Sequence, residues 1–186
     1  MQIHTERLLL RPIHKKDASV VFAYRSDKST SQYQGWVPET LEDTIDFIQN
    51  KICAMMNRPG TWFQMVIINQ ENDAIIGDIG IHFTDEENKQ AELGCTLDKK
   101  YQGKGYATEA MRAVINLLFN ELNKHRISAS IDPRNTESIK LVERLGFRLE
   151  EHFRESLLIN GVWVDDLVYC ILRIEWVERK RNDFPK

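Results

Sequence analysis

The sequence predicts an α+β (mixed α/β) fold, in which a central, mostly antiparallel, twisted sheet carries helices on both faces. Two pairs of consecutive strand segments are joined by short, turn-rich connections, which is typical of antiparallel hairpins. A long segment, 105–122, repeats apolar residues at the spacing of an amphipathic helix. A second helical pattern, 135–145, lies between two strand patterns, so helices and strands alternate there.

The first third of the chain is expected to form one strand and two helices. Arg7–Ile13 is a strand pattern that ends at Pro12, and Asp17–Arg25 is a short helix. Thr40 precedes an acidic turn and an amphipathic run, so a capped helix is expected to begin there. Pro59-Gly60 is expected to end that helix.

The remaining strands are expected in the middle and at the end of the chain. Gln70–Asp73 is expected to join Trp62–Asn69 to Ala74–Phe83 as a hairpin turn. Asn160-Gly161 is the strongest hairpin signal in the sequence. The expected strands are Trp62–Asn69, Ala74–Phe83, Gln90–Leu97, Arg126–Ile131, Phe147–Ile159 and Val162–Ile174.

Two helices complete the fold. Gly105–Leu122 has the clearest helical pattern of the chain. Asn135–Leu145 is expected to begin with Asn135 as its cap and to stop just before Gly146.

Composition limits the class of protein. The 186 residues favour one domain, 1–186, with ordinary proportions of hydrophobic (42%) and charged (28%) residues. A net charge of −3 gives no reason to expect direct nucleic-acid binding. No run is apolar enough to span a membrane. The three scattered cysteines and five histidines show no metal-ligand spacing, so no metal is expected, and the cysteines suggest a reducing cytoplasmic location.

The most informative segment joins the strand ending at Leu97 to the long helix. Gly103 and Gly105 permit positive φ angles, so backbone amides there can turn toward an anion at the helix N-terminus. A diphosphate suits such a nest of amides. The segment lacks the spacing of a P-loop, and Thr108 stands where a dinucleotide-binding fingerprint needs a third Gly or Ala.

Several blocks together resemble one family. Gln102-x-x-Gly105-x-Ala107 is similar to the acetyl-CoA signature of GNAT (Gcn5-related) N-acetyltransferases. The opening Thr5–Pro12, the strand Ala91–Gly94, and Asn135-x-x-Ser138 followed by Leu145-Gly146-Phe147 resemble the RimJ/RimL branch, which acetylates N-termini of ribosomal proteins.

The resemblance implies a GNAT acyl-CoA N-acyltransferase fold, acetyl-CoA as co-substrate and a set of binding residues. The strand would splay near Cys95–Leu97, leaving the Leu97 amide facing the thioester oxygen. Asn135 would bond the pantetheine arm as well as cap its helix. The residues expected to hold the diphosphate are Gln102, Gly103, Lys104, Gly105, Tyr106, Ala107 and Thr108.

Two residues are candidates for catalysis. Glu92 is the candidate base, acting through water, although a solvated strand charge is an equal reading. Asp165 and Asp166 are weaker candidates, of which at most one faces the site, because adjacent strand residues point to opposite faces. Ser138 is the candidate acid for the departing thiolate, and its alternative is a bond to the helix backbone.

The expected acceptor is a primary amine, first of all a protein N-terminal α-amine of the ribosomal-protein type. Deprotonating an α-amine at pH 7 costs roughly 1 kcal/mol, against about 4.6 kcal/mol for lysine, so a weak base suffices. Trp36 is expected as a pocket wall or a loop anchor. The alternatives are a small amine (polyamine, aminoglycoside or amino-acid derivative) and a non-catalytic acyl-CoA-binding protein. A homodimer is an expectation drawn from the pairing of relatives through edge strands.

Overall fold

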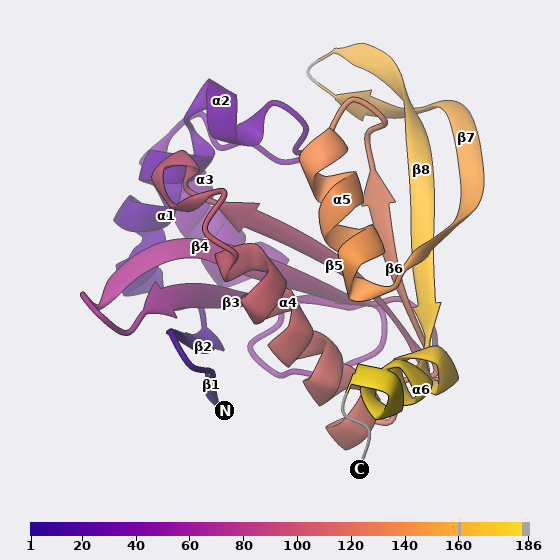
Figure 1. Cartoon of the computed structure of the whole chain (residues 1–186). Coiled ribbons are helices and arrows are strands. Elements are labelled where there is room, and N and C mark those ends of the chain that lie inside the picture. The colour runs from indigo at the N-terminus through magenta and orange to yellow at the C-terminus, as the bar shows by residue number, and fades with distance from the viewer. Residues whose placement is uncertain (160, 184–186) are drawn as a thin grey trace.

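The computed structural model describes residues 1–159 and 161–183. In this part of the chain, eight strands form one sheet in the order β1-β2-β3-β4-β5-β6-β8-β7 (Figure 1). Neighbouring strands are antiparallel except β5 and β6, which are parallel, so the expected α+β class is confirmed. The strands are β1 (Ile3–His4), β2 (Leu8–Pro12), β3 (Thr61–Asn69), β4 (Ala74–Phe83), β5 (Gln90–Leu97), β6 (Arg126–Ile131), β7 (Arg148–Ile159) and β8 (Val162–Leu172).

Helices cover both faces of the sheet (Figure 1). A short 3-10 turn at Lys15–Asp17 precedes α1, and another at Lys99–Tyr101 lies within the loop between β5 and α4. π-Helical turns at Phe47–Lys51 and Leu117–Glu121 extend α3 and α4. None of the helices in the described ranges is long and apolar enough to cross a bilayer. The α-helices are α1 (Ala18–Arg25), α2 (Lys28–Ser31), α3 (Leu41–Asp46), α4 (Tyr106–Asn116), α5 (Thr136–Leu145) and α6 (Arg173–Asp183).

Two hydrophobic clusters hold these layers together. The larger lies between the sheet and α4, α5 and α6, where Leu93 and Leu97 of β5 pack with Met111 of α4. The smaller lies on the opposite face, where Val21 of α1 packs against Val66 of β3. Because both faces of β3 and β4 are covered, these strands are buried almost throughout instead of alternating between buried and exposed residues.

The sheet is split between its two parallel strands. Gln90–Glu92 pair with Arg126–Ser128, and no pairing continues beyond Glu92. The Asp98 amide donates to the Ile76 carbonyl of β4 at 2.9 Å. Since backbone groups alternate in direction along a strand, the amides of Leu97 and Cys95 point toward β6, into the split. The opening therefore includes the expected segment, Cys95–Leu97, but begins nearer the start of the strand.

Two expected element ends were wrong. The helix after Thr40 stops at Lys51, well before Pro59-Gly60, because Ile52 is extended and the Cys53 amide donates to the Trp62 carbonyl of β3 at 2.7 Å. At the other end of the chain, the expected strand to Ile174 ends at Leu172, and α6 follows unpredicted. There the Glu175 carboxylate accepts from the Leu172 amide at 2.8 Å, which satisfies an amide at the helix start.

The hairpin turn between β7 and β8 can be compared with expectation at one residue only. Gly161 has φ 77°, the left-handed conformation expected of such a turn. Asn160 lies outside the described residues. The flanking strands pair antiparallel as expected, with Ile159 opposite Val162.

Candidate active site

The loop between β5 and α4 presents unpaired backbone donors. Gly103 and Gly105 have φ 73° and 81°, a conformation that glycine adopts without strain. Gly105 is the N-cap of α4, and the first amide to bond back is that of Glu109, which donates to Gly105 at 3.1 Å. Within the described ranges, the backbone amides of residues 103–108 donate no hydrogen bond to the protein. They form a row of free donors at the positive end of a helix.

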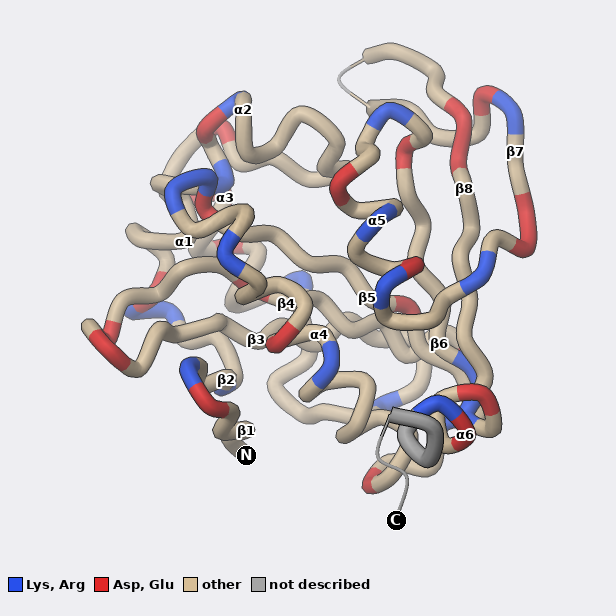
Figure 2. Tube along the Cα trace, in the orientation of Figure 1, with Lys and Arg blue, Asp and Glu red and all other residues tan. Residues whose placement is uncertain are grey.

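Polar side chains link this loop to its surroundings. The Gln102 amide nitrogen donates to the Leu97 carbonyl at 2.9 Å, which ties the loop to the end of the split strand. Arg144 of α5 donates to the Thr108 hydroxyl at 3.3 Å. Figure 2 shows basic segments in this connection, which contains Lys99, Lys100 and Lys104. The charge of the connection thus suits an anion.

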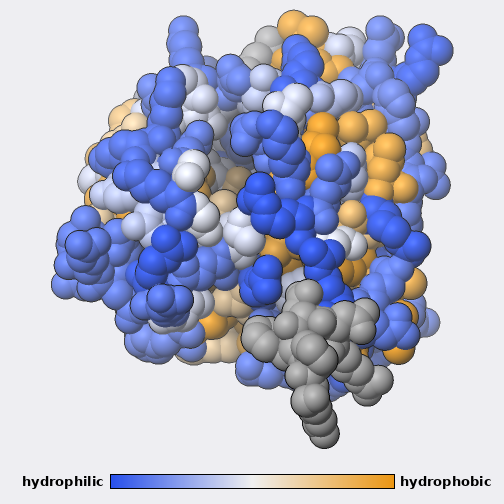
Figure 3. Space-filling model, in the orientation of Figure 1, coloured by the Kyte–Doolittle hydropathy of each residue, from blue (hydrophilic) through white to orange (hydrophobic). Residues whose placement is uncertain are grey.

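A cavity of about 940 Å³ lies at the split. Its walls come from both faces of the sheet: Trp36, Trp62 and Glu92 belong to the α1 side, whereas Met111 and Ser138 belong to the α4–α5 side. Figure 3 shows a recess on the front face beside α5, with apolar surface toward the β7–β8 side. The opening between β5 and β6 therefore connects the two sides of the molecule.

The floor of the cavity on the α1 side is formed by two glycines. Gly80 of β4 and Gly94 of β5 are cross-strand partners, and both line the cavity. A Cβ atom added to Gly94 would have no atom within 4 Å, so this glycine faces open space. The pair leaves a gap between Glu92 and Thr96 in a row of side chains along β5.

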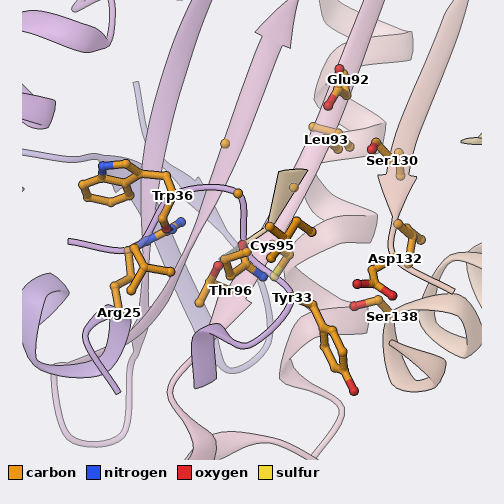
Figure 4. A pocket seen from close by; sticks show the side chains of 18 of the residues that line it. Arg25, Tyr33, Trp36, Glu92, Leu93, Cys95, Thr96, Ser130, Asp132 and Ser138 are labelled. Atoms are coloured by element: carbon orange, nitrogen blue, oxygen red, sulfur yellow. The ribbon is translucent and has the colours of Figure 1, made fainter. Parts of the chain in front are cut away.

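Glu92 stands at one end of this gap (Figure 4). Its side chain is 33% exposed, and its Oε2 lies 3.9 Å from Nδ1 of His82, whose ring stacks on Trp62. Burial raises the pKa of Glu92, although the nearby His82 opposes part of that effect. A carboxylate with a raised pKa accepts protons more readily than a carboxylate with an ordinary pKa.

The two neighbouring aspartates of β8 point to opposite faces, as the strand alternation predicts. Asp166 accepts from the Ser130 hydroxyl at 2.7 Å, and its charge contributes to the raised pKa of Glu92. Asp165 bonds His152 at 2.7 Å and the Glu155 amide at 2.9 Å. Of the two, Asp166 therefore lies nearer Glu92, but neither lines the cavity.

Asn135 and Ser138 meet at the start of α5. The Asn135 side chain accepts from the Ser138 amide at 3.2 Å, so the expected helix cap is confirmed. Both residues line the cavity, and Figure 4 shows Ser138 beside Asp132 across from Cys95. The Ser138 hydroxyl makes no hydrogen bond within the described ranges, so it is available to a ligand. Glu92, Asn135 and Ser138 thus share one cavity, while the 102–108 loop and Leu97 lie outside its lining.

A buried polar network supports the cavity and was not foreseen. Asp78 of β4 is fully buried and accepts from the Tyr24 hydroxyl at 2.5 Å, from Arg25 at 2.5 and 3.0 Å, and from Gln64 at 2.5 Å. The Cζ atom of Arg25 also lies 5.1 Å from the centre of the Trp36 ring. The signal in the sequence was the one carboxylate in a mostly apolar strand.

Trp36 fulfils both expected roles. It lines the cavity, and its ring stacks on Phe47 at 4.1 Å, which fixes the loop before α3. The Arg25 guanidinium lies over the Trp36 ring and connects this wall to the buried network around Asp78.

Cys95 lies in the split, but its thiol has low reactivity. Burial, reinforced by Asp78, raises the pKa of its thiol to about 12. The thiol is therefore protonated at neutral pH and a poor nucleophile. Elsewhere in the described ranges, no three His, Cys, Asp or Glu side chains gather as metal ligands would.

Comparison with known proteins places this geometry in a family. The model of the acetyltransferase (GNAT) domain matches residues 7–148. The chain is 35% identical to the uncharacterized N-acetyltransferase p20 of Bacillus licheniformis, over 94% of this chain and 97% of the relative. It is 26% identical to the ribosomal protein uS5-alanine N-acetyltransferase of Escherichia coli (strain K12), over 95% and 93%.

Solved structures agree. A GNAT-family acetyltransferase from Bacillus anthracis superposes with a TM-score of 0.82 and 32% identity, covering 94% of this chain and all of that one. The spermidine N-acetyltransferase of Vibrio cholerae, in complex with CoA and spermine, shares the fold with a TM-score of 0.80 and 22% identity, over 93% and 99% of the chains. With its split sheet and its row of free amides, the chain belongs to the GNAT acetyltransferase family and is an acetyl-CoA-dependent N-acetyltransferase.

Proposed function

We propose that this enzyme moves the acetyl group directly onto the α-amine of a protein N-terminus. The observation that carries this assignment is Glu92, a carboxylate in the cavity that is one-third exposed (33%). Such a base is too weak to deprotonate a lysine, at a cost of about 4.6 kcal/mol, but it can serve an α-amine, at roughly 1 kcal/mol. The E. coli relative that acts on an alanine of ribosomal protein uS5 supports the same acceptor class.

In this proposal the β5–α4 loop binds the cofactor. The free amides of Gly103 through Thr108 donate hydrogen bonds to the diphosphate oxygens of coenzyme A, and the Lys104 ammonium adds positive charge. Gln102 holds the loop against Leu97 through its 2.9 Å bond. The pantetheine arm then follows the open edge of β5 toward the cavity, where Asn135 is within its reach.

The transfer is a single displacement. The amine nitrogen attacks the thioester carbonyl carbon, a C–N bond forms, and the C–S bond breaks. The inward-facing amides of Leu97 and Cys95 stabilise the charge that develops on the carbonyl oxygen. The amine proton passes to Glu92 through water, and the Ser138 hydroxyl protonates the leaving thiolate. Ser138 then takes up a proton from solvent water and Glu92 releases one to it, so the net movement is one proton from the amine to the thiol. The high pKa of Cys95, about 12, supports this direct route over one through an acetylated cysteine.

A small polyamine is the second candidate acceptor. Glu39, Asp43 and Asp46 line the cavity on the side of α3, and carboxylates at a mouth attract polycations. Part of that charge is already engaged, because the Asp43 carboxylate accepts from the amides of Glu39 and Thr40. The Vibrio cholerae enzyme of the same fold is named for spermidine.

Steady-state turnover of acetyl-CoA distinguishes these acceptors. The panel is a lysine-free peptide with a free N-terminal alanine, the same peptide with a blocked N-terminus, a blocked peptide that contains lysine, and spermidine. We expect turnover with the free N-terminus and none with the blocked, lysine-free peptide. A higher kcat/KM for spermidine than for the free peptide would replace the first proposal with the second.

A further inference from the structure

The segment before β2 contacts the first turn of α4 directly. The Glu109 carboxylate accepts from the Thr5 hydroxyl at 2.6 Å, from the Arg7 amide at 2.9 Å and from the Arg7 Nε at 2.7 Å. The Arg7 Nη2 completes a two-pronged ion pair with Glu109 at 2.7 Å. These bonds join residues that are about a hundred positions apart in the sequence, and they lie where the β5–α4 loop enters α4.

The same guanidinium also contacts the loop itself. Arg7 Nη1 donates to the Lys104 carbonyl at 3.1 Å, and its Cζ lies 4.5 Å from the centre of the Tyr106 ring. A Cβ atom added to Gly105 would lie 3.4 Å from Arg7 Nη2. Arg7 therefore packs directly on the loop backbone.

The bond to Lys104 fixes the direction of a donor. Lys104 lies between Gly103 and Gly105, two residues with positive φ, so the peptide joining Lys104 to Gly105 has unusual freedom to rotate. In a planar trans peptide, the carbonyl and the following amide point in opposite directions. When Arg7 holds the Lys104 carbonyl, the Gly105 amide must point away from Arg7.

The ion pair also controls charge beside the amides. Burial raises the pKa of Glu109, but the hydrogen bonds from Thr5 and Arg7 outweigh that effect, so its pKa is lowered overall. Glu109 is therefore ionised at neutral pH. Without Arg7, this carboxylate, whose side chain is 17% exposed, would repel an anion at the same helix end.

We propose that Arg7 is a positioning residue of the coenzyme A site, which orients the Gly105 amide and neutralises Glu109. This inference rests on the proposed role of the loop in binding the diphosphate. It makes the segment before β2 part of the cofactor site, although that segment lies outside the cavity.

The test compares two acetyl donors, acetyl-CoA and acetyl-pantetheine, which lacks the diphosphate. With Arg7→Ala, we expect the KM for acetyl-CoA to rise about tenfold while kcat stays within about twofold. The kcat/KM for acetyl-pantetheine should not change. Arg7→Lys keeps the charge but cannot bond Glu109 and Lys104 together, so it should raise the KM about threefold. It also serves if Arg7→Ala does not fold.

Arg112→Ala is the matched control, because Arg112 is an exposed arginine further along α4, and its kinetics should equal wild type. An unchanged KM for acetyl-CoA in Arg7→Ala, or an equal loss of kcat/KM with both donors, would overturn the role of Arg7. If wild-type enzyme uses both donors equally well, the diphosphate site itself fails, and with it the larger proposal.

Discussion

The β5–α4 loop and the cavity differ in the atoms that form them. The loop and the first turn of α4 offer backbone amides from six consecutive positions, 103–108, and two glycines set their direction. The cavity is lined by side chains from the segment before α3, from β3, β4 and β5, and from α4 and α5. A backbone site tolerates most substitutions of exposed side chains, whereas a side-chain site depends on each contributor. Cofactor binding and acceptor binding should therefore respond differently to mutation.

The largest expected effect tests whether the cavity depends on buried side chains. Asp78→Ala leaves Arg25 buried without its counter-charge, so the free energy of unfolding should fall by about 3–5 kcal/mol. Urea denaturation measures this, with Lys104→Ala as an exposed control in the loop that should not change stability. A loss below about 1 kcal/mol for Asp78→Ala would show that the network around Asp78 is dispensable.

The second effect separates acceptor binding from cofactor binding. Gly94→Phe places a ring in the cavity beside Glu92, where an added Cβ meets no atom within 4 Å. Acetyl transfer should fall about 100-fold because the acceptor is displaced, while calorimetry shows coenzyme A affinity within about threefold of wild type. The acetyl-transfer rate of Gly94→Ala should lie between those of wild type and Gly94→Phe. Equal loss of transfer and of coenzyme A binding would mean that the two regions are not separable.

The smallest effect concerns the base. Glu92→Gln should lower kcat/KM on an N-terminal peptide about tenfold at pH 7. Wild-type activity should rise with pH as Glu92 loses its proton, over a range shifted above that of an ordinary glutamate because burial raises its pKa. The variant should lack that rise, and it should approach wild type above about pH 8, where the α-amine deprotonates unaided.

Asp165→Asn provides the control for this pH profile, since Asp165 points to the other face and bonds His152. Its profile should match wild type. An Asp165→Asn variant with the profile expected of Glu92→Gln would move the base to β8.

The same difference explains what the sequence could predict. The bounds of β4, β5 and β6 and the Asn135 cap follow from local signals, namely turns, alternation and a capping side chain. The glycine pattern of the loop could be recognised in the sequence because its residues are contiguous. The partners of Asp78 could not be predicted, because Tyr24 lies 54 positions away in the sequence and Gln64 lies 14 away. Likewise, the start of the split depends on the pairing of β5 with β6, which no local pattern reveals.

The central claim is that the amides of residues 103–108 bind the diphosphate of coenzyme A. Titration of ¹⁵N-labelled protein with coenzyme A, followed by amide NMR, tests it most directly, with ADP and adenosine as matched ligands with and without the diphosphate. The amide signals of Gly103 and Gly105 should move with coenzyme A and with ADP but not with adenosine. Binding of coenzyme A that leaves these signals in place would contradict the account.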